Sequence, residues 1–126
     1  MILRHHGGAA LPSSSVNSSW QDRKATLMAE KARIAQRVAS QIAGWVPHLD
    51  GVLHNAGLLT EITPMAEIQL QDWMNVMQVN VNATFMLTQA LLPLLLKSES
   101  GSLVFTSSSV GRQGRANWGA YAASKF

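Results

Sequence analysis

The hydrophobic positions divide the chain into an unpatterned beginning and a patterned remainder. Residues 1–20 hold two adjacent glycines, a proline and five serines without a helical or strand period, which predicts loop or disorder. A helical period follows from about residue 25 to residue 45, and we expect a surface helix that packs its apolar face on a sheet and ends before Pro47. The apolar positions of this helix are Leu27, Ile34, Val38, Ile42 and Trp45.

Two short apolar runs later in the chain predict buried strands, and a long apolar helix separates them. The first run begins at Leu49 and ends in Asn55-Ala56-Gly57, and the second covers residues 102–106 and ends in Ser107-Ser108-Ser109. Residues 71–96 are apolar on most sides, which predicts a largely buried helix or one with a second apolar face for a partner. Strand, helix and strand make a βαβ unit, so we expect parallel strands and a right-handed crossover. Ligands bind beyond the carboxyl ends of such strands, where both runs carry polar side chains.

The composition narrows the class of protein. Of the 126 residues, 47% are hydrophobic and 13% are charged, which fits a single folded domain and excludes an intrinsically disordered chain. The absence of cysteine excludes a disulfide scaffold and a cysteine nucleophile. The four histidines lack metal-ligand spacing, so no metal site is expected.

The charge and hydropathy patterns bear on partners and location. The net charge of +3 comes from the first third of the chain, and without a basic stripe or interleaved aromatic residues we expect no nucleic-acid partner. A nucleic-acid binder that uses this basic third is a third and less favoured alternative. The longest apolar stretch, residues 76–96, contains amides, hydroxyls and a proline that would be costly in lipid, so no membrane span is expected. The beginning lacks a long apolar signal core, and the predicted location is the cytoplasm.

One group of residues has a spacing that suits acid–base chemistry. Tyr121 is the only tyrosine, and Lys125 lies four residues later, on the same face of a helix. A cation beside a phenol favours the phenolate and suits the phenol to proton transfer near neutral pH. The hydroxyl of Ser108 could donate a hydrogen bond to a carbonyl oxygen that gains charge during reduction. Such a site would move a proton on and off a carbonyl or alcohol oxygen, and the hydride would come from a cofactor.

Each of these signals also has an ordinary explanation. A lysine four residues after a tyrosine arises by chance roughly once in twenty, and a run of serines is common at a strand-end turn. Asn55 and Asn80 could satisfy backbone groups, and His54 could be a packed strand residue. Arg112 and Arg115 could be solvated loop charges.

Taken together and in chain order, the motifs resemble the short-chain dehydrogenase/reductase family. Ser108 precedes Tyr121 by 13 residues, a spacing that fits the family. The resemblance covers about residues 30–126, and over residues 49–126 it is close to an enterobacterial type of oxidoreductase in that family. The motifs are Asn55-Ala56-Gly57, Asn80 within Gln78-Val79-Asn80-Val81, Gly101-Ser102-Leu103-Val104 followed by Ser107-Ser108, and Tyr121-x-x-x-Lys125.

The resemblance implies four catalytic positions. Tyr121 would be the acid/base, and Lys125 would hold the nicotinamide ribose and favour the Tyr121 phenolate. Ser108 would orient and polarise the substrate carbonyl, and it fits the spacing better than Ser107. Asn80 would help to hold a water in a proton relay towards Lys125.

The resemblance also implies a cofactor and partners. Asn55, with Ala56 and Gly57, would line the adenosine side of the cofactor cleft, while Tyr121 and Lys125 would hold the nicotinamide end. The cofactor would be NADP or NAD, and the substrate a small carbonyl compound or secondary alcohol. The helix over residues 71–96 would make a homo-oligomer contact in the complete protein.

The chain also departs from the family pattern. It has no Thr-Gly-x-x-x-Gly-x-Gly turn for the cofactor diphosphate and no residue that would choose NAD over NADP. Residues 1–26 stay unassigned and are expected to be disordered or foreign to the family, and residues 27–126 are expected to form a partial domain. The predicted fold is α/β, a partial Rossmann-like doubly wound parallel sheet truncated at both ends. We therefore expect an inactive, incomplete oxidoreductase, with a non-enzymatic remnant or a dimerising interaction fragment as the alternative.

Overall fold

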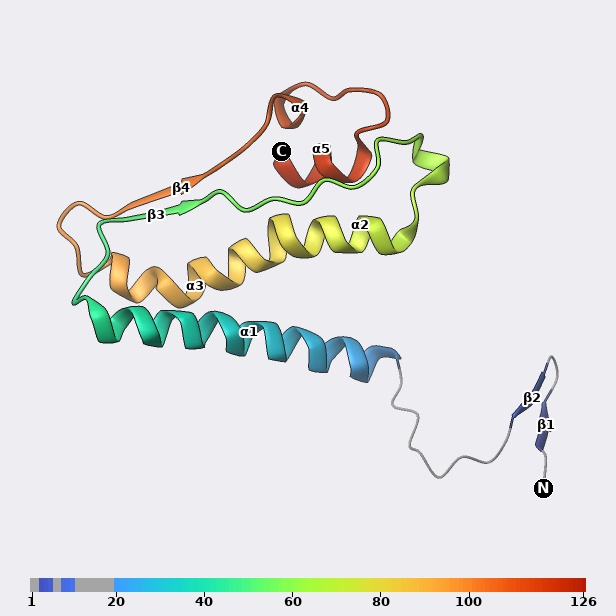
Figure 1. Ribbon diagram of the computed structural model, residues 1–126, viewed down its shortest axis with the longest axis horizontal. Helices are drawn as coiled ribbons and strands as arrows, with labels where there is room; N and C mark the ends of the chain where they lie inside the picture. Colours follow the sequence, from blue (N-terminus) through green and yellow to red (C-terminus); the bar gives the residue numbers. More distant parts are fainter. Residues whose placement is uncertain (1–2, 6–7, 11–19) are drawn as a thin grey trace.

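The computed structural model describes residues 3–5, 8–10 and 20–126 (Figure 1). Strands β1 (Leu3–His5) and β2 (Gly8–Ala10) pair antiparallel, with Leu3 opposite Ala10. The prediction of loop or disorder over residues 1–20 is therefore wrong at these two strands, and at residues 1–2, 6–7 and 11–19 it lies outside the described residues.

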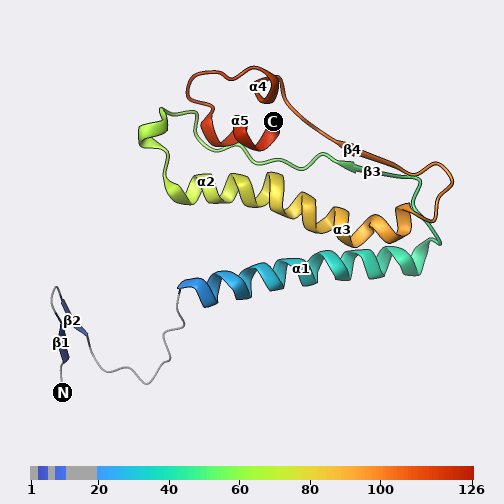
Figure 2. The ribbon, with the colours of Figure 1, turned by 180° about the vertical axis from the view of Figure 1, so that it is seen from behind.

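Helix α1 (Trp20–Trp45) lies beside the long helical segment over residues 70–95, on the side away from strands β3 (Gly51–His54) and β4 (Ser102–Phe105) (Figures 1 and 2). Among the α1 side chains that the structure describes, Ala35 and Ala39 are buried, and they pack with Ala90, Leu91 and Leu94 of helix α3 (Ala83–Leu95). This contact is the hydrophobic core of the described chain, and Ile42, Leu49, Val52, Met86 and Leu87 pack around it.

The prediction of which α1 face is buried is wrong in most positions. Leu27, Ile34 and Trp45 are 54%, 64% and 78% exposed, and of the five predicted apolar positions Ile42 alone joins the core. The separation of two packed helices depends on the side chains between them, and small alanines allow a close approach. The larger side chains are therefore left on the flank of the contact.

Strands β3 (Gly51–His54) and β4 (Ser102–Phe105) form a two-stranded parallel sheet, as predicted. Gly51 lies opposite Ser102 and His54 opposite Phe105, so the two strands end at the same level. The register brings the residues that follow each strand together at one edge of the sheet.

The strands are not buried on both faces, contrary to the prediction. Val52 packs on the core, and because successive side chains of a strand point to opposite faces, Leu53 lies on the other face. Leu53 and its register partner Val104 are 64% and 51% exposed. The prediction assumed that both faces of a parallel sheet are covered, whereas this chain covers the face toward α3.

The long helix predicted over residues 71–96 is confirmed, with an irregular turn at its centre. Helix α2 (Leu70–Met77) passes into a π-helical turn, η2 (Gln78–Asn82), and then into α3. A π-helix is rare and often coincides with a functional site. Here it contains Asn80, a polar residue that is only 8% exposed.

Short elements complete the described chain: η1 (Met65–Glu67), α4 (Ser109–Arg112) and α5 (Gly119–Lys125). Asn117 lies in the loop that leads into α5, two residues before the helix begins. Its φ is 70°, a left-handed conformation that asparagine tolerates better than most residues. Gly111 lies against the backbone of Lys125 so closely that a Cβ would overlap its carbonyl. A glycine at this position lets α4 pack on the end of α5.

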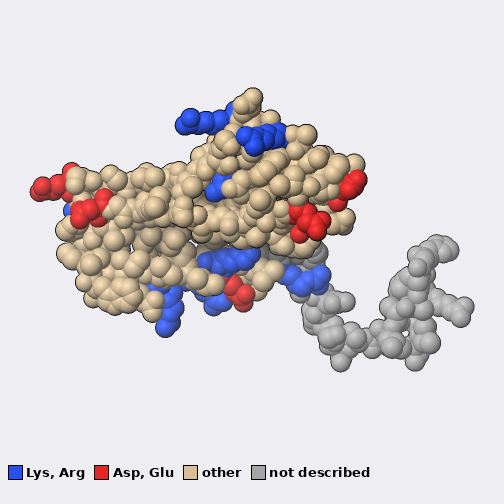
Figure 3. Space-filling model, turned by 45° about the horizontal axis from the view of Figure 1, so that its top comes forward, with Lys and Arg blue, Asp and Glu red and all other residues tan. Residues whose placement is uncertain are grey.

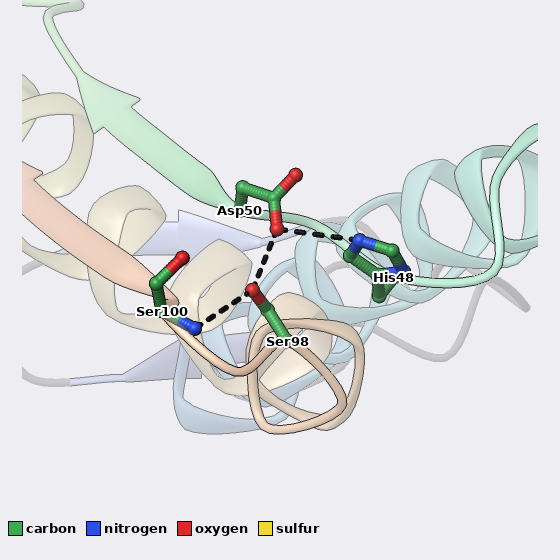
Figure 4. Close-up of polar contacts among 4 residues, drawn as sticks. All are labelled: His48, Asp50, Ser98 and Ser100. Atoms are coloured by element: carbon green, nitrogen blue, oxygen red, sulfur yellow. Dashed lines mark hydrogen bonds and ion pairs between the residues drawn. The ribbon is translucent and has the colours of Figure 1, made fainter.

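On the face shown in Figure 3, basic side chains gather at the top and along the lower side of the body, and most acidic side chains lie toward its two ends. At the amino-terminal end of the sheet, Ser98 donates to Asp50 at 2.6 Å and His48 lies 3.3 Å from the same carboxylate (Figure 4). Over the described part of the chain, the structure contains no helix with the length and apolar character needed to cross a membrane.

Candidate active site

The carboxyl ends of β3 and β4 are tied together by both backbone and side chains. The N–H of Thr106 donates to the carbonyl of His54 at 2.9 Å, which extends the ladder by one step. The hydroxyl of Thr106 donates to Oδ1 of Asn55 at 2.8 Å. Asn55 therefore holds the two strand ends at a fixed spacing, and the segment Asn55-Ala56-Gly57 leaves the sheet from that point.

Asn80 binds the segment that follows this strand end. The N–H of Leu58 donates to Asn80 Oδ1 at 2.7 Å, and Asn80 Nδ2 donates to the carbonyl of Leu58 at 3.0 Å. The side-chain amide thus pairs with one backbone unit as a neighbouring strand would. The result is a fixed distance between the loop after β3 and the centre of the long helix.

The π-helical turn explains how Asn80 can serve this role within a helix. The N–H of Ala83 donates to the carbonyl of Gln78, five residues earlier, so the turn is wider than an α-helical one. The hydroxyl of Thr84 donates to the main-chain carbonyl of Asn80 at 3.1 Å. The side chain of Asn80 remains available to contact Leu58.

A third hydrogen bond links Asn80 to helix α5. Asn80 Nδ2 donates to Oγ of Ser124 at 2.8 Å, and the Ser124 hydroxyl donates to the carbonyl of Tyr121 at 2.8 Å. Ser124 was not a predicted site residue. Its place one residue before Lys125 and three after Tyr121 was the available signal, because that spacing puts it on the same turn as both.

Lys125 lies where the strand ends and α5 meet. Its Nζ donates to the carbonyl of Thr106 at 3.0 Å and is 5.8 Å from the centre of the Tyr121 ring. A Cβ built on Gly57 would be 3.3 Å from Nζ, so this glycine leaves space for the ammonium group. The main-chain carbonyl of Lys125 accepts the hydroxyl of Ser107 at 2.7 Å.

The adjacent serines Ser107 and Ser108 have different environments. Ser107 holds the end of α5, whereas Ser108 is the N-cap residue of α4 and its hydroxyl makes no cap hydrogen bond. Ser108 is half-buried, and α4 packs on α5. The structure therefore leaves the Ser108 hydroxyl available where the Ser107 hydroxyl is committed to the backbone.

His54 is a packed strand residue, as the ordinary explanation held. Its ring stacks on Phe105, with centroids 5.2 Å apart, and Nε2 lies 2.9 Å from the hydroxyl of Thr88. That hydroxyl donates its hydrogen to the carbonyl of Thr84, so His54 Nε2 is the donor. Burial lowers the pKa of His54 below its ordinary value of 6.5.

Two clefts open beside these residues. One of about 390 Å³ is lined by Asn80, Ser107, Ser124 and Lys125 among others, and one of about 280 Å³ by Tyr121 and Trp118 among others. The Trp118 and Tyr121 rings lie 6.0 Å apart at a tilt of 56°. Tyr121 and Lys125 thus line two different clefts.

The structure brings together most of the predicted site residues. Asn55 and Lys125 both contact Thr106, and Asn80 connects through Ser124 to the helix that carries Tyr121. Ala56 lines the larger cleft. Ser108 stands at the start of α4, beside this helix, without a hydrogen bond that joins it to Tyr121.

Comparison with known proteins identifies the family of this arrangement. A family model described as short chain dehydrogenase matches residues 17–126. The chain belongs to the short chain dehydrogenase family. The family relation covers the βαβ unit, the Asn80 segment and α5, so the predicted fold class and family are confirmed.

Relatives of this chain within the family are longer than it is. The uncharacterized oxidoreductase YciK of Escherichia coli is 77% identical over 91 residues, which are 72% of this chain and 36% of that protein. A short chain dehydrogenase of Escherichia coli CFT073, solved in complex with NADPH, has a TM-score of 0.74 and 74% identity, over 75% of this chain and 40% of its own. The chain therefore spans well under half the length of these relatives.

A shorter part of the chain is similar to a protein of another kind, a repressor. Over 42 residues, a third of this chain, the sequence is 74% identical to the glycerol-3-phosphate regulon repressor of Escherichia coli, and the match covers 17% of that repressor. Because the lengths matched to the repressor and to the oxidoreductase together exceed 126 residues, the two matches overlap.

Proposed function

We propose that this chain provides the catalytic part of an NADP(H)-dependent oxidoreductase that interconverts a small carbonyl compound and a secondary alcohol. The observation that carries the proposal is the position of α5, which places Tyr121 and Lys125 at the carboxyl ends of β3 and β4 and is bound there through Asn80. Membership of the short chain dehydrogenase family supports the class of reaction.

The residues at the strand ends fit the nicotinamide-ribose end of the cofactor. An ammonium group has three N–H donors, and the bond to Thr106 uses one of them. The remaining donors suit ribose hydroxyl oxygens, and Gly57 leaves the space in which the ammonium lies. Asn55 and Ala56 stand at the same edge, so they would line the cofactor cleft.

The chemistry then divides between cofactor and protein. The bound nicotinamide supplies or accepts the hydride. Tyr121 gives a proton to the substrate oxygen in reduction and takes it back in oxidation, and the Lys125 ammonium favours the phenolate form. Ser108 donates a hydrogen bond to the same oxygen as it gains charge. Asn80 positions α5 and would help to hold a water of the proton relay.

The preference for NADP(H) over NAD(H) rests on a relative. The similar Escherichia coli structure was solved with NADPH, and it is 74% identical to this chain. The 126 residues lack the glycine-rich turn that holds the cofactor diphosphate, so a segment outside this sequence would have to supply that part of the cofactor site. We propose that the 126-residue chain alone does not oxidise NADPH or NADH with carbonyl substrates.

A graft tests the proposed function. Residues 49–126 would replace the matching segment of the Escherichia coli oxidoreductase, and NADPH oxidation would be followed with an aldehyde or ketone that the parent enzyme reduces. We expect the graft to retain turnover and Tyr121→Phe to lower kcat by about 10²–10⁴-fold, the usual contribution of a general acid. Ser108→Ala should lower kcat more than the matched variant Ser107→Ala.

Two results would contradict the proposal. One is a graft that binds NADPH and reduces the substrate equally well with Tyr121→Phe. The other is an unchanged kcat in Ser108→Ala, because the proposal assigns the Ser108 hydroxyl a hydrogen bond to the substrate oxygen. Measurable turnover by the 126-residue chain alone would contradict the narrower proposal that this chain is inactive.

A second proposal, that the chain is an interaction fragment, is favoured by its exposed apolar side chains. Leu53 and Val104 on the sheet and Phe85 on α3 are more than half exposed. We propose that the complete enzyme is a cytoplasmic homo-oligomer with contacts through residues 71–96. Light scattering across a dilution series measures association of the chain, and a monomer at all concentrations would exclude the interaction reading.

A further inference from the structure

We propose that Ser124 is a positioning residue that fixes Tyr121 and Lys125 by joining helix α5 to Asn80. The proposal rests on the proposed function, because it deepens the account of the same site. Its physical content is that one hydroxyl sets the orientation of the helix that carries both reactive side chains.

The Ser124 hydroxyl has two hydrogen-bond partners with defined directions. Its hydrogen is donated to the Tyr121 carbonyl at 2.8 Å, and its lone pair accepts Asn80 Nδ2 at 2.8 Å. A hydroxyl carries one hydrogen, so the first bond determines that Ser124 is the acceptor in the second. The pair of bonds connects a backbone carbonyl of α5 to an amide side chain of the π-helical turn.

Asn80 is a rigid anchor for this connection. It is 8% exposed, and its two further hydrogen bonds hold the backbone of Leu58. Leu58 directly follows Asn55-Ala56-Gly57, the segment that leaves the end of β3. The Ser124 bond therefore places α5 relative to the strand end as well as to the long helix.

Helix α5 needs such a contact to keep its orientation. It has seven residues, begins at a glycine, and the Trp118 side chain at its N-cap makes no cap hydrogen bond. Helices this short are marginal without tertiary contacts. Ala120 is buried and fixes the first turn, whereas the last turn is held by the Ser124 bond to Asn80, the Ser107 bond to the Lys125 carbonyl and the Lys125 bond to Thr106.

The Ser107 and Ser124 bonds of the last turn restrain different motions. Ser107 binds a carbonyl at the end of the helix, so it limits the distance of that end from β4. Ser124 is a side chain on the helix surface, between Tyr121 and Lys125 in the sequence, so its bond to Asn80 limits rotation about the helix axis. Rotation changes where the phenol and the ammonium point.

Nuclear magnetic resonance of the full 126-residue chain tests this directly. Tyr121 is the only tyrosine, so a label on tyrosine rings reports on this residue alone, and the Lys125 Nζ lies 5.8 Å from the ring centre. We expect Ser124→Ala to remove the ring-current shift of the Lys125 ε-methylene protons and their cross-relaxation with the ring. Ser124→Thr keeps the hydroxyl and should retain both signals.

Ser98→Ala is the matched control. Its hydroxyl also has two hydrogen-bond partners, Asp50 and the N–H of Ser100, but it lies at the opposite end of the strands (Figure 4). This control should leave the Tyr121–Lys125 signals unchanged. An unchanged contact in Ser124→Ala, or its loss in Ser124→Thr, overturns the proposal.

A second measurement needs no variant. The Asn80 side-chain amide protons bind Leu58 and Ser124, whereas Asn82 Nδ2 makes a longer bond of 3.3 Å to Gln78. We expect the Asn80 protons to exchange with solvent roughly tenfold more slowly than those of Asn82, and equal rates would count against the anchor. Neither measurement needs cofactor or substrate, so failure of hydride transfer in the graft would overturn the proposed function while this positioning role stood.

Discussion

Replacing Asn80 with alanine is expected to destabilise the chain more than replacing a polar residue at the strand ends. The change removes three hydrogen bonds, two to Leu58 and one to Ser124. At about 1 kcal/mol net for each bond, the free energy of unfolding should fall by about 3 kcal/mol. A 126-residue domain at the low end of normal stability has roughly 6 kcal/mol, so this is about half of the total.

Urea unfolding followed by far-ultraviolet circular dichroism measures the effect. With an m-value of about 2 kcal/mol per molar urea, the midpoint should fall by about 1.5 M. Asn82→Ala is the matched control, because Asn82 lies in the same π-helical turn and makes one bond of 3.3 Å to Gln78. We expect it to cost less than about 1 kcal/mol.

The difference between the losses of unfolding free energy in Asn80→Ala and Asn82→Ala shows whether the hydrogen bonds of Asn80 stabilise the chain. Equal losses from Asn80→Ala and Asn82→Ala would show that the π-helical turn is sensitive to any change and that the three bonds of Asn80 carry no special weight. A loss below about 0.5 kcal/mol for Asn80→Ala would refute the anchor outright.

Three further predictions follow from other contacts. Because burial lowers the pKa of His54 below 6.5, the unfolded chain binds a proton first, so the free energy of unfolding should fall as the pH drops through about 6.5, and urea titrations of His54→Gln should lack this part of the pH dependence. Gly111→Ala places a Cβ on the Lys125 carbonyl and should cost about 1–3 kcal/mol, whereas Gly114→Ala, where the Cβ meets nothing within 4 Å, should be nearly neutral in the same assay. Asp50→Ala removes the hydrogen bond from Ser98 together with the exposed contact with His48, so the cost should stay below about 2 kcal/mol; a larger loss would contradict this (Figure 4).

The sequence was informative where local patterns determine the structure. The apolar runs ending in Asn55 and Ser107 identified both strands, and the continuous apolar segment identified the long helix. The spacing of Tyr121 and Lys125 placed them on one helix, α5. These predictions depend on periodicity over a few residues, which the fold did not override.

The sequence could not show which side chains meet across elements. On α1 the large apolar residues suggested the buried face, but the close approach of α3 is made by Ala35 and Ala39. The bond between Asn80 and Ser124 joins residues 44 positions apart, and no local pattern encodes it. The roles of the site residues stay predictions. The domain boundary at residue 26 also stays a prediction: the family match begins at residue 17, and a stretch of 42 residues is similar to a repressor.

The open face of the sheet has a thermal consequence. Leu53 and Val104 lie side by side in register and keep more than half of their surface in water in the folded chain. Unfolding raises the heat capacity because it exposes buried apolar surface to water, so apolar surface that is already exposed in the folded chain adds nothing to this rise. Calorimetry should therefore give a heat-capacity change below the roughly 1.5–1.9 kcal/mol/K expected for a compact chain of this length, and a stability curve that bends only gently with temperature.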